Sequence, residues 1–367
     1  RRRKNKKRKY NSCKIMSVFS NIKFYLCILT CLFCNRSIYA QDIHFSQIQE
    51  SPLWLNPANA GSFDGYFRAI ANYRNQWASM GNAFQTMAVS VDAVTLKTRK
   101  GKGYLGLGMY VFNDKAGVAK IGSTQAQFHL SAIVKLSKKS KMAGAAYVGY
   151  NQSTANFSAL TFGNQFNGKD IDNSLANGEV NPFITHANLD AGVGFNYEFS
   201  NAKIGIVRDK MFTLKIGGAA HHINKPVLYY TNGSNYKLPI RFTGNVQAKI
   251  EIKDSKISFL PSVIYLSQAS ASEINIGTFI RYRLKNATKI TGINHERGIN
   301  FGLYYRVKDA IVPQINLDMG KYAIGLSYDM NISQYRQVSK TVGGFEIYLK
   351  FISLSDGLFK RRREYGL

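Results

Sequence analysis

The chain has 367 residues, a formal net charge of +28 at pH 7 and 13% aromatic residues. The first 40 residues contain eleven Lys or Arg and no acidic residue, which leaves +17 for residues 41–367. In this later part the basic residues are scattered through short turns, whereas nucleic-acid-binding proteins usually concentrate them in one patch, so we expect no nucleic-acid partner. All four Cys precede Gln41, which excludes a disulfide, a Cys nucleophile and a Cys metal site in the later part.

The amino-terminal region has the features of an export signal. We interpret the basic stretch over residues 1–9 as sequence upstream of the signal and not as a nucleic-acid-binding arm. Phe24–Cys34 is an apolar run of eleven residues, too short for a transmembrane helix of about 20 residues. Ile38-Tyr39-Ala40 resembles a small-residue cleavage site. Residues 1–40 are therefore predicted to contain a signal peptide, and the mature chain is predicted to begin at Gln41.

Residues 41–62 do not alternate cleanly and are predicted to precede the first strand as a periplasmic lead-in segment. Pro52 and Pro57 lack the N–H group that a central strand needs. Asn56-Pro57 is also a turn signal. We expect this segment to fold into or across the mouth of the domain that follows, and the sequence does not distinguish a segment inside that domain from one outside it.

Residues 63–356 contain repeated runs in which apolar and polar residues alternate with a period of two. Between Ala187 and Phe199, for example, Leu189 and Val193 lie on one face of a strand and Asp190 on the other. About fourteen such runs are present, and most reach the 9–11 residues that a tilted membrane strand requires. The count is even, as in bacterial single-chain barrels. The sequence therefore predicts an all-β fold, a transmembrane antiparallel up-and-down β-barrel of about 14 strands.

Charged residues on the polar faces distinguish this barrel from a soluble β-sandwich, whose inner face packs against a second sheet. They are too numerous for a dry core, whereas a polar or ion-paired lumen accommodates them. We expect the lumen-facing charges to include Asp190, Glu198, Arg241, Arg281, Arg283, Arg306 and Lys321. The carboxylates among them are interpreted as ion-pair partners of Arg and Lys, not as acid–base catalysts.

The connection lengths indicate the topology. The long connections Phe157–Thr185, Lys225–Lys237 and Asn331–Val342 all follow odd-numbered strands, as external loops should when the first strand starts in the periplasm. Lys285–Gly298 is an exception, because it is long for a periplasmic turn. Residues 357–367 form a basic carboxy-terminal tail after the last predicted strand.

Motifs for catalysis or metal binding are missing. The six His residues show no HExxH or comparable ligand spacing. His221 and His222 are adjacent in a predicted strand, so we expect them to point to opposite faces and not to share one metal ion. No P-loop, GxGxxG or nucleophile elbow occurs in the context that each needs. We expect no enzyme activity, no cofactor and no metal.

Three stretches of the mature chain form a recognisable signature. The opening stretch comprises Asp42, Phe45, Ser46, Gln47, Pro52, Leu53, Asn56, Pro57, Ala58, Gly61, Tyr73, Arg74 and Trp77. Shorter motifs follow at His222-Ile223-Asn224-Lys225-Pro226 and Gly343-Gly344-Phe345-Glu346. Together they resemble the opening, middle and closing motifs of the PorP/SprF family of Bacteroidota. Members of that family are outer-membrane barrels associated with the type IX secretion system and gliding motility.

The resemblance implies an accessory of type IX secretion in the bacterial outer membrane, which helps to export or attach a large adhesin. Its expected partners are outer-membrane lipid, a secreted cargo with a type IX sorting domain, and a periplasmic or peptidoglycan-associated protein. The opening-signature residues are then expected partner contacts. The alternative is a porin or transporter, because a basic lumen with Arg281, Arg283 and Arg306 would favour anions.

Overall fold

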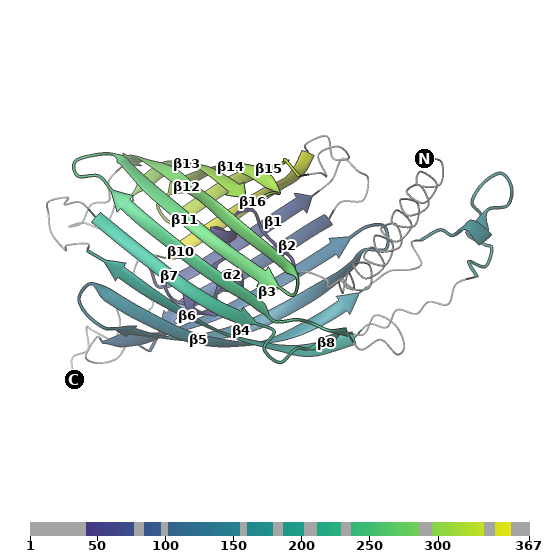
Figure 1. Ribbon diagram of the computed structural model, residues 1–367, viewed down its shortest axis with the longest axis horizontal. Helices are drawn as coiled ribbons and strands as arrows, with labels where there is room; N and C mark the ends of the chain where they lie inside the picture. Colours follow the sequence, from purple (N-terminus) through teal and green to yellow (C-terminus); the bar gives the residue numbers. More distant parts are fainter. Residues whose placement is uncertain are drawn as a thin grey trace, which may run out of the picture. The chain divides into compact units, whose positions relative to one another are not determined.

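A closed barrel of antiparallel strands forms the body of the molecule (Figure 1). The computed structural model describes residues 42–76, 84–96, 102–154, 160–178, 186–201, 211–228, 236–285, 296–333 and 342–353. Fourteen strands pair in the cyclic order β1-β16-β15-β14-β13-β12-β11-β10-β7-β6-β5-β4-β3-β2. Pairing of β1 with β16 closes the barrel, for example Tyr73 opposite Ile347. The predicted fold class is confirmed.

The barrel strands are ten to fifteen residues long. They are β1 (Phe67–Gln76), β2 (Phe84–Thr95), β3 (Gly103–Ala116), β4 (Ile121–Lys135), β5 (Ser140–Thr154), β6 (His186–Ser200), β7 (Met211–His221), β10 (Arg241–Glu251), β11 (Ile257–Gln268), β12 (Ala271–Lys285), β13 (Arg297–Arg306), β14 (Ala310–Met319), β15 (Tyr322–Asn331) and β16 (Val342–Ser353). A separate two-stranded sheet pairs β8 (Val227–Leu228) with β9 (Tyr236–Lys237). The helical turns are η1 (Ile48–Glu50), α2 (Pro52–Leu55), η2 (Pro57–Asn59) and η5 (Gly163–Gln165). In the described part of the chain, no helix has the length and apolarity needed to cross a membrane.

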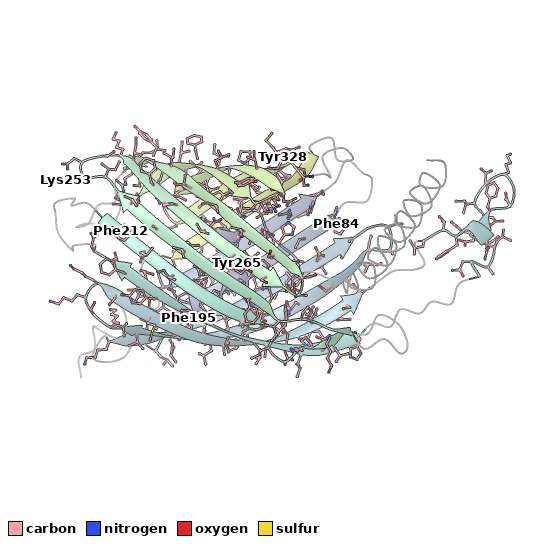
Figure 2. The ribbon with its side chains drawn as sticks, viewed as in Figure 1. Phe84, Phe195, Phe212, Lys253, Tyr265 and Tyr328 are labelled. Atoms are coloured by element: carbon pink, nitrogen blue, oxygen red, sulfur yellow. The ribbon has the colours of Figure 1, made fainter. Side chains whose placement is uncertain are left out.

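Alternation along the strands separates an apolar outer face from a polar inner face. In β2, Met87 and Val89 are more than half exposed, whereas Ala88 between them and Ser90 after them are 2% exposed. Large aromatic side chains lie towards both ends of the outer face, with Phe84 and Tyr328 at one end and Phe212 at the other (Figure 2). Aromatic residues near both membrane interfaces are typical of outer-membrane barrels, so the outer face has the character of a lipid-facing surface.

The two ends of the barrel differ in their connections. The end at which β1, β5, β7 and β15 finish has long connections, and we call it the long-loop end. The opposite end, where β1 begins and β16 finishes, is called the short-turn end. The connections at the long-loop end include 77–83, 155–185, 222–240 and 332–341, and those at the short-turn end include 136–139 and 252–256. Residues 286–296 form a longer connection at the short-turn end, as the sequence had indicated.

The space enclosed by the strands is occupied by the segment that precedes β1. Residues 42–61 are called the plug from here on. Phe45, Leu53 and Asn56 of this segment are 0% exposed, and they contact strands on several sides of the barrel. The plug therefore lies inside the lumen, one of the two arrangements that the sequence left open.

Candidate functional site: the plugged lumen

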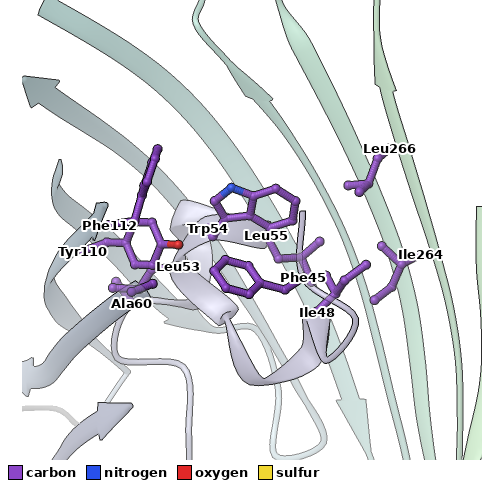
Figure 3. Packing of buried hydrophobic residues seen from close by; sticks show 11 residues of the cluster. Phe45, Ile48, Leu53, Trp54, Leu55, Ala60, Tyr110, Phe112, Ile264 and Leu266 are labelled. Carbon is purple, nitrogen blue, oxygen red and sulfur yellow. The ribbon is translucent and has the colours of Figure 1, made fainter. Parts of the chain in front are cut away.

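The centre of the plug is an apolar cluster that reaches two walls of the barrel (Figure 3). Its plug members are Phe45, Ile48, Leu53, Trp54, Leu55 and Ala60. Tyr110 and Phe112 join it from β3, and Ile264 and Leu266 join it from β11. The rings of Phe45 and Trp54 meet edge to face, with their centroids 6.0 Å apart. Burying a large apolar side chain contributes roughly 1.5–3 kcal/mol relative to water, so this cluster holds the plug firmly in the lumen.

Ser46 and Gln47 form the first polar anchor of the plug. Their backbone N–H groups donate to the two carboxylate oxygens of Glu346, at 2.7 and 3.1 Å. The Ser46 hydroxyl oxygen accepts from Arg74 and Arg306, and both guanidinium groups also bind Asp329. All of these side chains are at most 3% exposed. A carboxylate that accepts backbone N–H groups beside a guanidinium forms strong charge-assisted hydrogen bonds, so this cluster holds the plug to β1, β13, β15 and β16.

Asp42 forms a second anchor, at the long-loop end. Its carboxylate lies 2.6 Å from Nε2 of His222 and 3.0 Å from Nη1 of Arg241. The other ring nitrogen of His222 lies 2.9 Å from the carboxylate of Asp190. Burial favours neutral His222, but the charge of Asp42 and the hydrogen bonds with Asp190 and Asp42 outweigh it and raise the pKa of His222 to about 9. Burial also opposes ionisation of Asp42, yet His222 and Arg241 hold its pKa well below the usual range. The pair is therefore charged at neutral pH.

Asn56 forms a third anchor, in the middle of the plug. Its side-chain oxygen accepts from the N–H of Ala58 and so caps the turn η2, which begins at Pro57. Its side-chain nitrogen donates to the carbonyl of Phe195 and to the side chain of Asn196 on β6. A Cβ atom at Gly194 would lie 2.3 Å from the Asn56 side-chain oxygen. The lumen wall therefore needs a glycine here for the plug to approach.

The plug ends at a fourth anchor near the short-turn end. The N–H of Gly61 donates to Asp92 at 2.8 Å, and the same carboxylate binds Arg68 of β1. Arg68 also donates to the carbonyl of Asn59. The hydroxyl of Ser131 on β4 donates to the carbonyl of Ala60. Polar contacts are thus distributed along the whole plug and reach both ends of the lumen.

Among the described residues, cavities are found on both sides of the plug. The outer cavity, of about 400 Å³, is lined by Asp42 and His44 of the plug and by the ends of strands at the long-loop end. The inner cavity, of about 310 Å³, is lined by Gln49 and Glu50 of the plug and by Lys215 of β7. The two cavities share no lining residue. One cavity therefore lies on the side of the long loops and the other on the side of the short turns, with plug residues lining both.

The residues of the opening signature are brought together in this plug. The buried ones are Phe45, Ser46, Gln47, Pro52, Leu53, Asn56, Pro57, Ala58 and Gly61 on the plug and Arg74 on β1. Asp42 is one-fifth exposed at its side chain, Tyr73 lies on the outer face of β1, and Trp77 is outside the described residues. The middle and closing motifs meet the opening one, because His222 binds Asp42 and Glu346 binds Ser46.

Most of the charges predicted to face the lumen are found there in ion pairs. Arg241, Arg283 and Arg306 are at most 4% exposed, and Asp190 is 2% exposed. Glu198 pairs with Lys141 at 3.0 Å, and Arg281 pairs with Glu296 and Asp318. Lys321 lies in the turn between β14 and β15 and not within a strand.

The expected opposite orientation of His221 and His222 is wrong. Strand β7 ends at His221, and His222 follows with a positive φ of 59°, which turns the chain out of the strand pattern. Both side chains are therefore buried, with ring centroids 6.4 Å apart. Even so, the described residues contain no group of three His, Cys, Asp or Glu that could hold a metal ion.

Several residues of the site were not singled out from the sequence. Asp92, Asn196 and Asp329 each bind the plug or an arginine that contacts it. Their only signal was a place on the polar side of an alternating strand, which many other residues share. Gly194 gave no signal, because the need for a glycine depends on Asn56, which is far away in the sequence.

Comparison with known families gives one match that covers most of the chain. The model of the family described as type IX secretion system membrane protein PorP/SprF matches residues 37–351. A search of curated proteins finds no match.

Solved structures with similar folds are distant. A FadL homologue from Pseudomonas aeruginosa is 9% identical, with 83% of this chain and 94% of that chain covered and a TM-score of 0.42. The KdgM porin is 9% identical, with 77% and 98% covered and a TM-score of 0.32. BamA from Haemophilus ducreyi, lacking POTRA domains 1–3, is 8% identical, with 78% and 70% covered and a TM-score of 0.39. These similarities are too weak to support an inference about function.

Proposed function

This chain belongs to the PorP/SprF family of type IX secretion system membrane proteins and lies in the outer membrane, and from that premise we propose that it is an accessory of this secretion system. In this role it assists the export or the surface attachment of a large adhesin-type cargo that bears a type IX sorting domain. A link to gliding motility and a periplasmic or peptidoglycan-associated partner belong to the same proposal.

The observation that supports this proposal best is the plug. A lumen filled by the protein's own chain, with separate cavities on its two sides, favours action by binding over action by conduction. The contact surfaces for cargo would then be at the long-loop end, around the connections 155–185, 222–240 and 332–341.

The arrangement of the lumen residues supports the alternative, an anion-selective porin, less well. The basic residues on which it depended are paired, since Arg281, Arg283 and Arg306 all lie within 3.4 Å of carboxylates. A guanidinium that is paired with a carboxylate attracts a passing anion less strongly than an unpaired one, because the carboxylate already compensates its charge.

The test compares the surface and secreted proteins of a strain that lacks this gene with those of its parent and of a complemented strain. Loss of one or a few very large proteins with type IX sorting domains, restored by complementation, is the expected result. An unchanged set of secreted proteins with altered uptake of small anions would overturn the accessory role and favour the porin. Gliding of the same strains on agar tests the link to motility.

A further inference from the structure

The plug begins and ends at opposite ends of the barrel. Its first described residue, Asp42, donates its N–H to Gln268, the last residue of β11, at 2.9 Å. The Asp42 carboxylate binds Arg241, the first residue of β10, and His222, which directly follows β7. These three partners all lie at the long-loop end.

The other end of the plug leads directly into the barrel wall. Gly61 binds Asp92, which lies near the end of β2 at the short-turn end. Five residues later, the N–H of Tyr66 donates to the carbonyl of Ser353, the last residue of β16, at 3.0 Å. The chain therefore enters β1 from the short-turn end, after passing through the lumen.

We propose that the amino-terminal end of the plug, at Asp42, is displayed on the same side of the membrane as the long loops. Strands of ten or more residues span roughly 33 Å or more along their own direction. The path through the lumen from Asp42 to the short-turn end is about as long as these strands. The completely buried side chains of Phe45, Ile48 and Leu53 already fill that path.

The outer cavity gives the displayed end an opening. Asp42, Ile43 and His44 line this cavity together with Asp309, whose side chain is 43% exposed in the connection between β13 and β14. A protein that approaches the long-loop end would thus meet the amino-terminal end of the plug as well as the loops. This placement does not depend on what the partner is, so it can hold or fail independently of the proposed function.

Cysteine labelling tests the placement, because residues 41–367 contain no Cys. One variant has Gly-Ser-Cys inserted directly before Asp42, and two reference variants are Lys169→Cys, in the 155–185 connection, and Lys253→Cys, in the 252–256 turn. Intact cells are treated with a membrane-impermeant maleimide, before and after the outer membrane is opened. The inserted Cys is expected to be labelled in intact cells together with position 169 and unlike position 253. If the inserted Cys is labelled only after the outer membrane is opened, as expected for position 253, the proposal is overturned.

A second pair of variants covers the case in which the insertion prevents assembly. Ile43→Cys lies at the outer cavity and Gln49→Cys at the inner cavity, and both are on the plug. Position 43 is expected to react in intact cells and position 49 only after the outer membrane is opened. The reverse pattern would show that the plug runs the other way. Heat-modifiable migration of the purified variants serves as the check that each barrel has formed.

Discussion

At the scale of single residues, the plug depends on glycines in the lumen wall. Replacing Gly194 by Val would place new carbon atoms where Asn56 and Pro57 pack. Overpacking of this kind costs about 1–3 kcal/mol, so we expect the free energy of unfolding of Gly194→Val to fall by about 2 kcal/mol in urea titrations in detergent or vesicles.

The matched control is Gly144 on β5, which is exposed on the outer face, and a Cβ atom added there would meet no other atom within 4 Å. Gly144→Val is expected to change the free energy of unfolding by less than about 0.5 kcal/mol. Equal losses in the two variants would indicate that valine weakens the strands themselves and that the plug is not the cause.

The contact between Asp42 and His222 predicts a pH dependence. The pKa of His222 is raised from 6.5 to about 9, so its contribution to stability is complete below pH 6.5 and is lost as the pH rises through about 9. Asp42 contributes above its usual pKa of 3.8, and its contribution is lost only in stronger acid. Asp190, Arg241 and His221 also surround this pair and remain in every comparison.

We therefore expect His222→Gln to destabilise the protein more at about pH 6 than at about pH 10, where the native His222 is already neutral. At the lower pH the loss should reach about 3 kcal/mol, because one partner of a buried pair is left uncompensated. The measurement is the urea midpoint of both proteins across this range. A difference that does not change with pH would contradict the charged state of His222.

At the scale of elements, the plug is held to β16 mainly through Glu346. Glu346→Ala leaves the N–H groups of Ser46 and Gln47 without their acceptor and removes one carboxylate from Arg74. Breaking a buried charged contact costs about 3–5 kcal/mol, so we expect a loss of about 3 kcal/mol in the free energy of unfolding and faster proteolysis within the plug.

Glu198→Ala is the control for a lumen carboxylate that does not touch the plug. Its ion pair with Lys141 is about one-fifth exposed at both side chains. Partly exposed pairs contribute little, so a loss of less than about 1 kcal/mol and an unchanged proteolysis pattern are expected. If Glu198→Ala exposed the plug as strongly as Glu346→Ala, the special role of the Ser46 anchor would be refuted.

The strands could be predicted from the sequence because their signal is local. Alternation with a period of two is visible within a window such as Ala187–Phe199, and it gave the number of strands as well as their inner charges. The interior path of the plug could not be predicted in this way. Ser46 and Glu346 are 300 residues apart, and no local pattern pairs them. Only the family resemblance marked both, and it did not indicate that they touch.

The orientation of His222 shows a second limit of local patterns. A strand pattern continued through His221 places the next side chain on the outer face. The strand ends there because His222 adopts a positive φ, in which it is held by Asp42 from the plug and Asp190 from β6. The conformation depends on partners that fold from distant parts of the chain.

At the scale of the whole molecule, we expect the plug to determine whether this barrel of fourteen strands conducts. The diameter of a barrel of this size lies between those of small packed barrels and of porins with open channels. The number of strands alone therefore does not indicate whether the lumen is open. With the plug in place, the outer and inner cavities share no lining residue. We expect the intact protein to show no conductance in a planar lipid bilayer, and a variant with residues 43–60 replaced by a Gly-Ser linker to show large, steady openings.

A second variant, Ser46→Ala with Glu346→Ala, keeps the whole chain and should open intermittently, because the plug loses one anchor while the apolar cluster around Trp54 remains. Steady conduction by the intact protein, at the level of the linker variant, would show that the plug does not close the lumen and would favour the porin over the secretion accessory.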